Sequence, residues 1–181
     1  NKDRADVYTQ REHYYDEAFG YVYGLDDNDL TDEINNGLLL GKYLNKHDGS
    51  GASGVNYRKR VYDAFKKGRQ AVVENCAEEL ATQIMEINTC LSKVVAWHAE
   101  DYLRSSASAL GTDGFFHDVS EAWGFVYSLQ FTRMSDGNPI FSHSEVNTML
   151  STLDSGDGAW SLDASTLNSM ADQIAAAVTY N

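Results

Sequence analysis

The distribution of apolar and polar positions is helical along most of the chain. Apolar side chains recur every three or four residues, and the sequence contains a single proline and few runs that alternate apolar and polar residues. This periodicity predicts an all-α fold. We expect one helical domain over residues 1–181, built as a bundle of about seven helices. The expected helices cover about residues 5–24, 32–46, 60–72, 77–103, 115–132, 146–153 and 163–178.

The longest helical stretch, residues 56–106, is expected to be interrupted. It contains no proline and one glycine, Gly68. A single helix of this length would far exceed the average of about 10–14 residues in globular proteins. We therefore place a break near Asn75. Further along, Ser142 and Glu145 have the spacing of a capping box, in which the two residues satisfy free amides at a helix start.

Two helical segments of the chain repeat each other. HYYDEAFGYVYG at residues 13–24 is echoed by HDVSEAWGFVYS at residues 117–128. Six of the first eleven positions are identical, and one aromatic residue replaces another at two more. The offset of 104 residues is too long for a solenoid repeat. It predicts two pseudo-symmetric halves whose duplicated helices, at about 5–24 and 115–132, face each other.

Each repeat carries an imidazole and a carboxylate on one helical face. At about 100° per residue, His13 and Glu17 lie within about 40° of each other around the axis. His117 and Glu121 reproduce this arrangement in the second copy. A helix that is apolar on nearly all sides is usually buried, so its polar groups need partners. We therefore expect the four side chains to meet in one cluster across a pseudo-two-fold axis.

Three interpretations of this cluster stay open. It is a buried hydrogen-bond network that fixes helix register, a zinc or iron site with two ligands from each helical face, or a hydrolytic centre where a glutamate activates metal-bound water. The metalloprotease motif HEXXH, a serine elbow and a glycine-rich phosphate loop are all absent, so no catalytic residue is assigned. Gly20 and Gly124 on the same stripe are expected to allow close approach of another backbone or a ligand.

The remaining histidines and the two cysteines are expected to be structural. The cysteines are too few for a disulfide scaffold and have the wrong pattern for a thiolate zinc site. The loop that starts at Asp154 lacks the glycine and glutamate of an EF-hand. The expected assignments are Cys76 and Cys90 as buried thiols, His47 in an exposed flexible loop (residues 47–54), His143 in the capping box, and His98 with Asp101 as a surface or partly buried pair.

Composition limits the class of partner. The 181 residues include 27 acidic and 14 basic side chains, for a net charge of −13. This charge repels nucleic acid and anionic membrane surfaces, so no nucleic-acid partner is expected. Residues 105–181 hold one cation, Arg133, and nine carboxylates, which is typical of a solvated acidic face. No apolar run approaches the ~20 residues that span a bilayer.

Four segments together resemble a known family. They are EHYYDEAFGYVYG, DAFKKGRQAV, HDVSEAWGFVYSLQF and GAWSLDASTLNSMADQIAAA. They resemble an uncharacterised family of bacterial proteins described as lipoproteins, which is similar to the imelysin-like proteins. The resemblance implies a duplicated all-helical bundle that is exported to the periplasm or cell surface. It also implies that this chain is the C-terminal part of a longer protein, which meets the membrane only through a lipid anchor on the missing N-terminal part.

Imelysin-like proteins carry a G-x-H-x-x-E motif proposed as a metal site, and this chain departs from it. Arg11 stands two positions before His13, and Asp16 stands three positions after it. In the second copy, Ser120 occupies the position of that acid, which leaves Glu121 as the shared carboxylate. The departures weaken the case for peptidase activity and for a conventional metal site.

The resemblance implies a set of ligands and a function. The ligands of a zinc or iron ion would be His13, Glu17, His117 and Glu121, with Asp16 as a further ligand. The expected function is that of an exported, non-enzymatic protein that binds a metal ion or a small metal-bearing ligand in iron or haem uptake. The alternatives are an imelysin-like metallopeptidase and a structural or interaction module with an inert buried His–Glu network.

Overall fold

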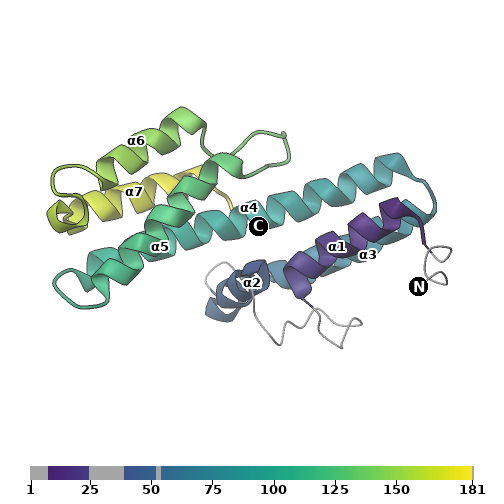
Figure 1. The fold of residues 1–181 in the computed structure, drawn as a ribbon, viewed down its shortest axis with the longest axis horizontal. Coiled ribbons are helices and arrows are strands. Elements are labelled where there is room, and N and C mark those ends of the chain that lie inside the picture. The colour runs from purple at the N-terminus through teal and green to yellow at the C-terminus, as the bar shows by residue number, and fades with distance from the viewer. Residues whose placement is uncertain (1–7, 25–38, 52–53, 181) are drawn as a thin grey trace. The chain divides into compact units, whose positions relative to one another are not determined.

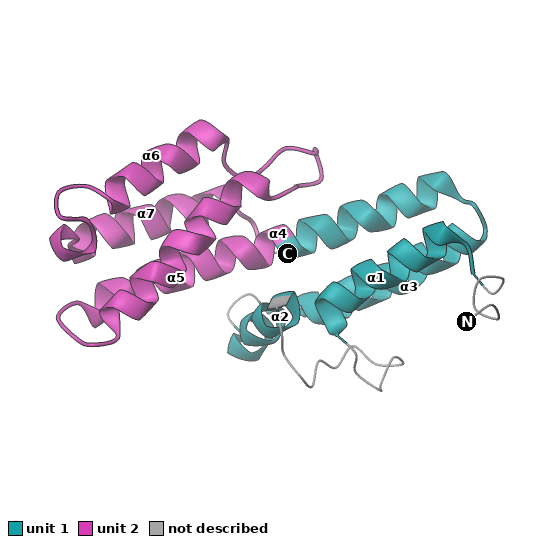
Figure 2. Ribbon diagram, viewed as in Figure 1, with its two compact units in different colours: residues 1–91 teal, residues 92–181 magenta. Residues whose placement is uncertain are grey.

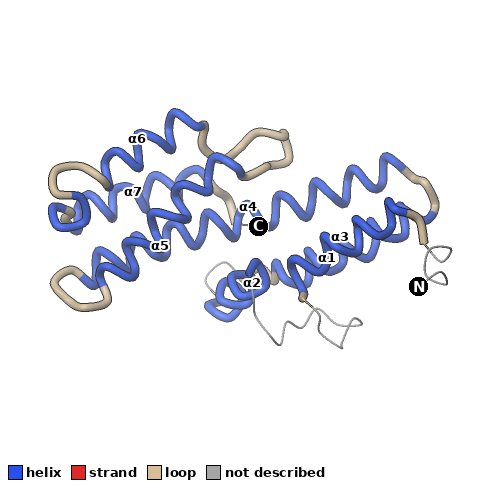
Figure 3. The backbone as a smooth tube through the Cα atoms, in the orientation of Figure 1, coloured by secondary structure: helices blue, strands red, loops and turns tan. Residues whose placement is uncertain are grey.

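The computed structural model describes residues 8–24, 39–51 and 54–180. Within these ranges the chain forms only helices, turns and loops (Figure 3), which confirms the predicted all-α fold with seven α-helices. None of the described helices combines the length and the apolar character needed to cross a membrane. The elements in chain order (Figure 1) are α1 (Gln10–Tyr23), α2 (Leu39–Ser50), α3 (Tyr57–Val73), α4 (Ala77–Ala109), α5 (Phe115–Ser128), the 3₁₀ helix η1 (Leu129–Phe131), α6 (His143–Leu153), the 3₁₀ helix η2 (Gly158–Ser161) and α7 (Ala164–Ala177).

The chain divides into two compact units within α4 (Figure 2). Unit 1 is residues 1–91 and contains α1, α2, α3 and the first part of α4. Unit 2 is residues 92–181 and contains the remainder of α4 with α5, α6 and α7. Each unit includes one copy of the duplicated segment. The single domain and the pseudo-symmetry of the two halves stay predictions.

Unit 2 is a four-helix bundle around one apolar core. Leu103 of α4, Val126 of α5, Val146 of α6 and Ile174 of α7 are all fully buried and belong to the same cluster. Burial of such a side chain stabilises a fold by about 1.5–3 kcal/mol. Because four helices contribute to one core, each is fixed about its own axis by the apolar face that it turns inward.

Unit 1 is held largely by aromatic contacts between α1 and α3. Phe19 stacks on Tyr23 with ring centroids 4.6 Å apart, and both meet Phe65 edge to face. The Tyr23 hydroxyl donates a hydrogen bond to the carbonyl of Arg58 over 2.7 Å. Aromatic pairs of this kind contribute about 0.5–1.5 kcal/mol beyond their area burial. These contacts determine which face of α1 turns toward α3.

Two local signals in the sequence act where they were predicted. Asn75 adopts a positive φ of 56° between α3 and α4, a conformation that asparagine tolerates better than most residues. At the start of α6, the amide of Glu145 donates to the Ser142 hydroxyl oxygen, and the Ser142 amide donates to the Glu145 carboxylate. The helix break and the capping box are therefore both confirmed.

The start of the first helix differs from the prediction. Helix α1 begins at Gln10 because Thr9 acts as its N-cap, with a capping box completed by Glu12. The hydroxyl of Thr9 accepts from the Glu12 amide, and the Thr9 amide donates to the Glu12 carboxylate. The predicted helical residues 5–7 lie outside the described residues.

The second helix extends further than predicted. Helix α2 runs to Ser50, through half of the segment 47–54 that was expected to be an exposed loop. Its last turn is tied to α3 by the carboxylate of Asp48, which caps that helix. The predicted residues 32–38 of α2 and loop residues 52–53 lie outside the described residues.

Candidate functional site

The first predicted pair lies on the exposed side of α1. His13 Nε2 is 3.3 Å from Glu17 Oε1, and the two side chains are 46% and 54% exposed. Tyr8 stacks on the imidazole with ring centroids 5.5 Å apart. Within unit 1 the pair is therefore formed and open to solvent, and its burial against the second repeat stays a prediction. Helix α1 makes its core contacts through other side chains, such as Val22, on the opposite side of the helix.

The second pair also points away from the core of its own unit. His117 is exposed and Glu121 is partly exposed, whereas Val119 and Val126 on the opposite side of α5 are buried. In the described part of unit 2, no ion pair joins His117 to Glu121. Each copy of the repeat thus presents its imidazole and carboxylate outward.

The predicted four-residue cluster requires the two units to meet. His13 and Glu17 belong to unit 1, and His117 and Glu121 belong to unit 2. Among the described residues, no three side chains of His, Cys, Asp or Glu come together in a group that could hold a metal ion. The cluster stays a prediction, and each unit taken by itself offers two ligands.

Asp16, the further candidate ligand, is held by an arginine of α3. Arg69 Nε donates to Asp16 Oδ1 over 2.6 Å, and Arg69 Nη1 donates to Glu12 Oε1 over 3.0 Å. The hydrogen bond with Asp16 is the main cause that raises the pKa of Arg69. A metal ion at Asp16 would have to break this ion pair. Sequence reasoning missed Arg69, because nothing in its local pattern shows that a charge 53 positions away lies beside it.

Tyr15 of α1 packs closely on α3. A Cβ atom at Gly68 would collide with the Tyr15 hydroxyl group, which has no hydrogen-bond partner among the described residues. Burial raises the pKa of Tyr15 to about 12, so the phenol is neutral at physiological pH. By contrast, a Cβ at Gly20 or Gly124 would meet no heavy atom within 4 Å. Neither glycine is therefore closely approached within its own unit, and the approach of the other repeat or of a ligand stays a prediction.

A buried histidine–carboxylate pair occurs where the sequence predicted a flexible loop. His47 is almost fully buried, and its Nδ1 lies 2.8 Å from Asp48 Oδ1. The same carboxylate accepts hydrogen bonds from the backbone amides of Tyr57 and Arg58, over 3.1 and 2.8 Å. Because Asp48 is engaged at the N-terminus of α3, the pair positions two helices. The assignment of His47 to an exposed loop is wrong.

Three other assignments are changed or refined by the structure. His98 is fully buried and stacks on Phe125 with ring centroids 5.1 Å apart, so it is not a surface residue. Cys90 is buried as predicted, but Cys76 is exposed. His143 is the first residue of α6 and lies beside the capping box without forming part of it. None of these positions adds a ligand to the two His–Glu pairs.

Comparison with protein families identifies one family that matches nearly the whole chain. Residues 2–180 match the family described as "Domain of unknown function (DUF4856)". The chain belongs to this family. The match covers both units and confirms the expectation of an uncharacterised domain family, whereas the relation to imelysin-like proteins and the lipoprotein character stay predictions. Comparison with curated proteins and with solved structures gives no significant match.

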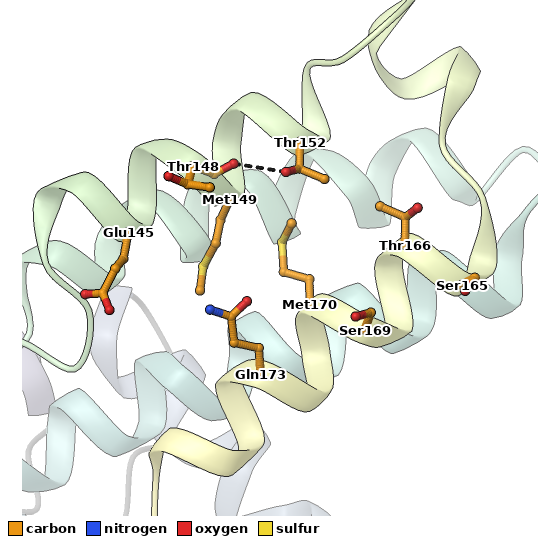
Figure 4. Close-up of a pocket in the computed structure, with 9 residues that line it drawn as sticks. All are labelled: Glu145, Thr148, Met149, Thr152, Ser165, Thr166, Ser169, Met170 and Gln173. Atoms are coloured by element: carbon orange, nitrogen blue, oxygen red, sulfur yellow. Dashed lines mark hydrogen bonds between the residues drawn. The ribbon is translucent and has the colours of Figure 1, made fainter.

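A groove of about 480 Å³ runs between α6 and α7 of the DUF4856 domain (Figure 4). Hydroxyl groups line it above the buried side chains of Met149 and Met170. The hydroxyls of Thr148 and Thr152 already donate to backbone carbonyls of α6. The lining includes no histidine, cysteine or cation, so the groove offers neither an acid–base pair nor a set of transition-metal ligands. Its lining residues are Glu145, Thr148, Met149, Thr152, Ser165, Thr166, Ser169, Met170 and Gln173.

Proposed function

We propose that this DUF4856 protein is a non-enzymatic binding protein that acts at the periplasm or cell surface. It takes up a metal ion or a small metal-bearing ligand for iron or haem acquisition. The His13–Glu17 pair is the observation that supports the proposal, because it brings an imidazole nitrogen and a carboxylate oxygen together on one exposed helical face.

The spacing of these two atoms fits a common metal ion. Protein ligands bind zinc at about 2.0–2.1 Å through histidine nitrogen and about 2.0–2.2 Å through carboxylate oxygen. Two such donors are therefore about 3.0 Å apart when the angle at the metal is 90°, and about 3.4 Å apart at a tetrahedral angle. The observed separation between Nε2 and Oε1 is 3.3 Å. The pair needs little rearrangement to bind a metal ion through both atoms.

The exposure of the pairs bears on the choice between binding and structural roles. An inert network that fixes helix register would be sealed from solvent, and its groups would bond to each other. Instead, His13 and Glu17 are each about half exposed, and His117 is exposed at the equivalent position of α5. Solvent access favours a role in which an ion or ligand arrives from outside. Two ligands in each unit also leave coordination positions for water or for a group carried by the metal.

The proposal is tested by zinc titration of chelator-treated protein in an isothermal calorimeter. We expect His13→Ala and His117→Ala each to weaken zinc binding at their own pair by at least about tenfold, which corresponds to about 1.4 kcal/mol. His143→Ala is the matched control, because His143 is also exposed but lies on α6 and is expected to leave binding unchanged. Binding weakens as the pH falls, because protons compete for the imidazole.

The form of the titration separates the possible arrangements. Two independent sites, each lost in one variant, would mean that each unit binds metal alone. One site weakened by either variant would mean that the four ligands meet. Absence of zinc binding, or equal binding by wild type and both variants, would overturn the proposal. Peptide hydrolysis that depends on zinc and on His13 would replace it with the metallopeptidase alternative.

A further inference from the structure

Unit 2 exposes a row of five aromatic side chains, which we call the aromatic row. Trp160 is 79% exposed and rests on Phe116 with ring centroids 4.4 Å apart. Trp123 stacks on Tyr127 at 5.7 Å with ring planes 12° apart, and Tyr127 meets the exposed Phe131 at 5.4 Å. Large aromatic groups are usually covered over most of their surface. A contiguous group of them at the surface marks an interaction site.

A cavity of about 400 Å³ lies within the aromatic row. Phe116 and Trp123 line it together with apolar side chains that include Val119 and Leu153. The carboxylate of Asp154 also lines the cavity and accepts a hydrogen bond from the Trp123 indole nitrogen over 3.1 Å. This bond orients the indole ring and places a negative charge at the edge of the Trp123 side chain. The cavity therefore combines an apolar pocket with one anionic group.

The charge around the aromatic row is strongly one-sided. Unit 2 (residues 92–181), which includes the whole row, holds eleven carboxylates and three cations, Lys93, Arg104 and Arg133. Asp157 stands in the turn just before Trp160. An acidic surface raises the association rate of basic partners and lowers that of acidic ones. A second copy of this chain, with a net charge of −13, is repelled.

We propose that the aromatic row is the docking site for a basic amphipathic segment of a partner protein. An apolar side chain of that segment enters the cavity lined by Phe116 and Trp123. Lysine or arginine side chains lie over the exposed ring faces, where they are attracted by the aromatic quadrupole, and one of them pairs with Asp154. Tryptophan and tyrosine are the residues that most often dominate the energy of such interfaces. A neutral sugar could stack on the rings and hydrogen-bond to Asp154, but it carries no charge for the acidic surface to attract.

The proposal is tested with a labelled helical peptide of leucine and lysine, about 14 residues or four turns long. Its counterpart has glutamate in place of lysine. Binding to the full chain is followed by fluorescence anisotropy. We expect the lysine peptide to bind at least about tenfold more tightly than the glutamate peptide, and Trp160→Ala to weaken the lysine peptide by about tenfold. Asp154→Asn is expected to have a smaller effect and to reduce the salt dependence of binding.

Charge-neutral variants separate the aromatic row from general attraction between a basic peptide and an acidic protein. Trp160→Ala leaves the net charge unchanged, and the exposure of this residue means that the substitution removes little from the core. Tyr21→Ala is the matched control, because Tyr21 is an exposed aromatic residue of α1 in unit 1. Unchanged binding in Trp160→Ala and Phe131→Ala overturns the proposal, as does equal loss in Tyr21→Ala. Tighter binding of chitotetraose, a neutral sugar, than of the lysine peptide also overturns it.

Discussion

Helices α1 and α5 contain related sequences but bury their aromatic residues to different extents. Tyr23 of α1 is 4% exposed, whereas the equivalent Tyr127 of α5 is 43% exposed. Phe19 of α1 packs edge to face on Phe65 of α3, whereas the equivalent Trp123 is exposed. The two copies therefore share a helix, its polar stripe and the burial of the equivalent residues Val22 and Val126, but they bury their aromatic residues to different extents.

The cause is an offset of the inward face around the helix axis. At about 100° per residue from the histidine, α1 buries Val22 and Tyr23 at about 180° and 280°. Helix α5 buries Ala122 and Val126 at about 140° and 180°, so the two inward faces overlap near 180° but extend in different directions. The side of α1 that carries Tyr23 contacts aromatic residues of α3, whereas α5 packs on the mixed apolar core of its bundle. The His–Glu stripe, between about 0° and 40°, lies on the outward side in both copies.

The largest expected effect comes from removing the ring of each equivalent tyrosine in turn. We expect Tyr23→Ala to lower the free energy of unfolding by about 3–5 kcal/mol, because it removes a buried ring and its hydrogen bond to Arg58. Tyr127→Ala is expected to cost less than about 1 kcal/mol, because its ring is largely at the surface. Urea denaturation followed by circular dichroism measures both. Equal losses would show that the two helices bury the same face.

The next test uses two glycines, Gly68 of α3, which packs against α1, and Gly124 of α5. A methyl group at Gly68 would collide with Tyr15, whose ring is held by Phe65, and would lie 3.3 Å from Cβ of Gln83. We expect Gly68→Ala to destabilise by about 1–3 kcal/mol, because overpacking outweighs the better helix propensity of alanine. Gly124→Ala in α5 meets nothing and is expected to stabilise by up to about 1 kcal/mol.

Thermal and urea unfolding of the two glycine variants measure these opposite signs. Tyr15→Leu supplies the control, because shortening this side chain is expected to reduce the cost of Gly68→Ala in a double-mutant cycle. A stabilising effect of Gly68→Ala in the wild-type background would contradict the close packing of α1 on α3.

Local signals in the sequence were sufficient to predict most of the fold. The break at Asn75 and the cap at Ser142 each depend on one or two residues and their immediate neighbours, so their positions could be predicted without knowledge of the tertiary structure. The end of α2 could not. Its last turn is tied to α3 through Asp48, whose partners are backbone amides nine and ten positions further along the chain.

The candidate site was harder to predict, because burial depends on neighbours that a single helix does not reveal. Sequence periodicity correctly placed His13 and Glu17 on one face, and the structure brings their side chains together. It also expected this face to be buried, since aromatic residues on the other sides suggested a helix buried all round, whereas the core of each unit lies on the other side of its helix. In α5 two such residues, Trp123 and Tyr127, are exposed instead. An exposed row of aromatic residues contains the same residue types as a buried core face, so the sequence of one helix does not distinguish the two.

The smallest effect concerns the starts of the two helices. Thr9 and Glu12 form a capping box at α1, whereas the N-cap residue of α5 is Gly114, which has no side chain to cap the helix. Thr9→Ala is expected to cost about 1 kcal/mol. The pKa of Glu12 lies below its ordinary value of 4.5. The main cause is the hydrogen bond from the Thr9 backbone amide, followed by those from the Thr9 side chain and from Arg69. Because the folded-state pKa is depressed, the box stabilises α1 above about pH 4.5 and this contribution is lost as the pH falls through the folded-state value.

Hydrogen exchange, corrected for intrinsic rates and measured from neutral pH to below pH 4, distinguishes the two starts. We expect the first turn of α1 to lose protection in acid and the first turn of α5 to show no such loss. The start of α6 is an internal control, because hydrogen bonds from the Ser142 side chain and backbone lower the pKa of Glu145 in the same way. If Thr9→Ala left the acid response of α1 unchanged, the response would have to come from the bond between Glu12 and Arg69. The difference between the two copies would then lie in their contacts with neighbouring helices and not in their caps.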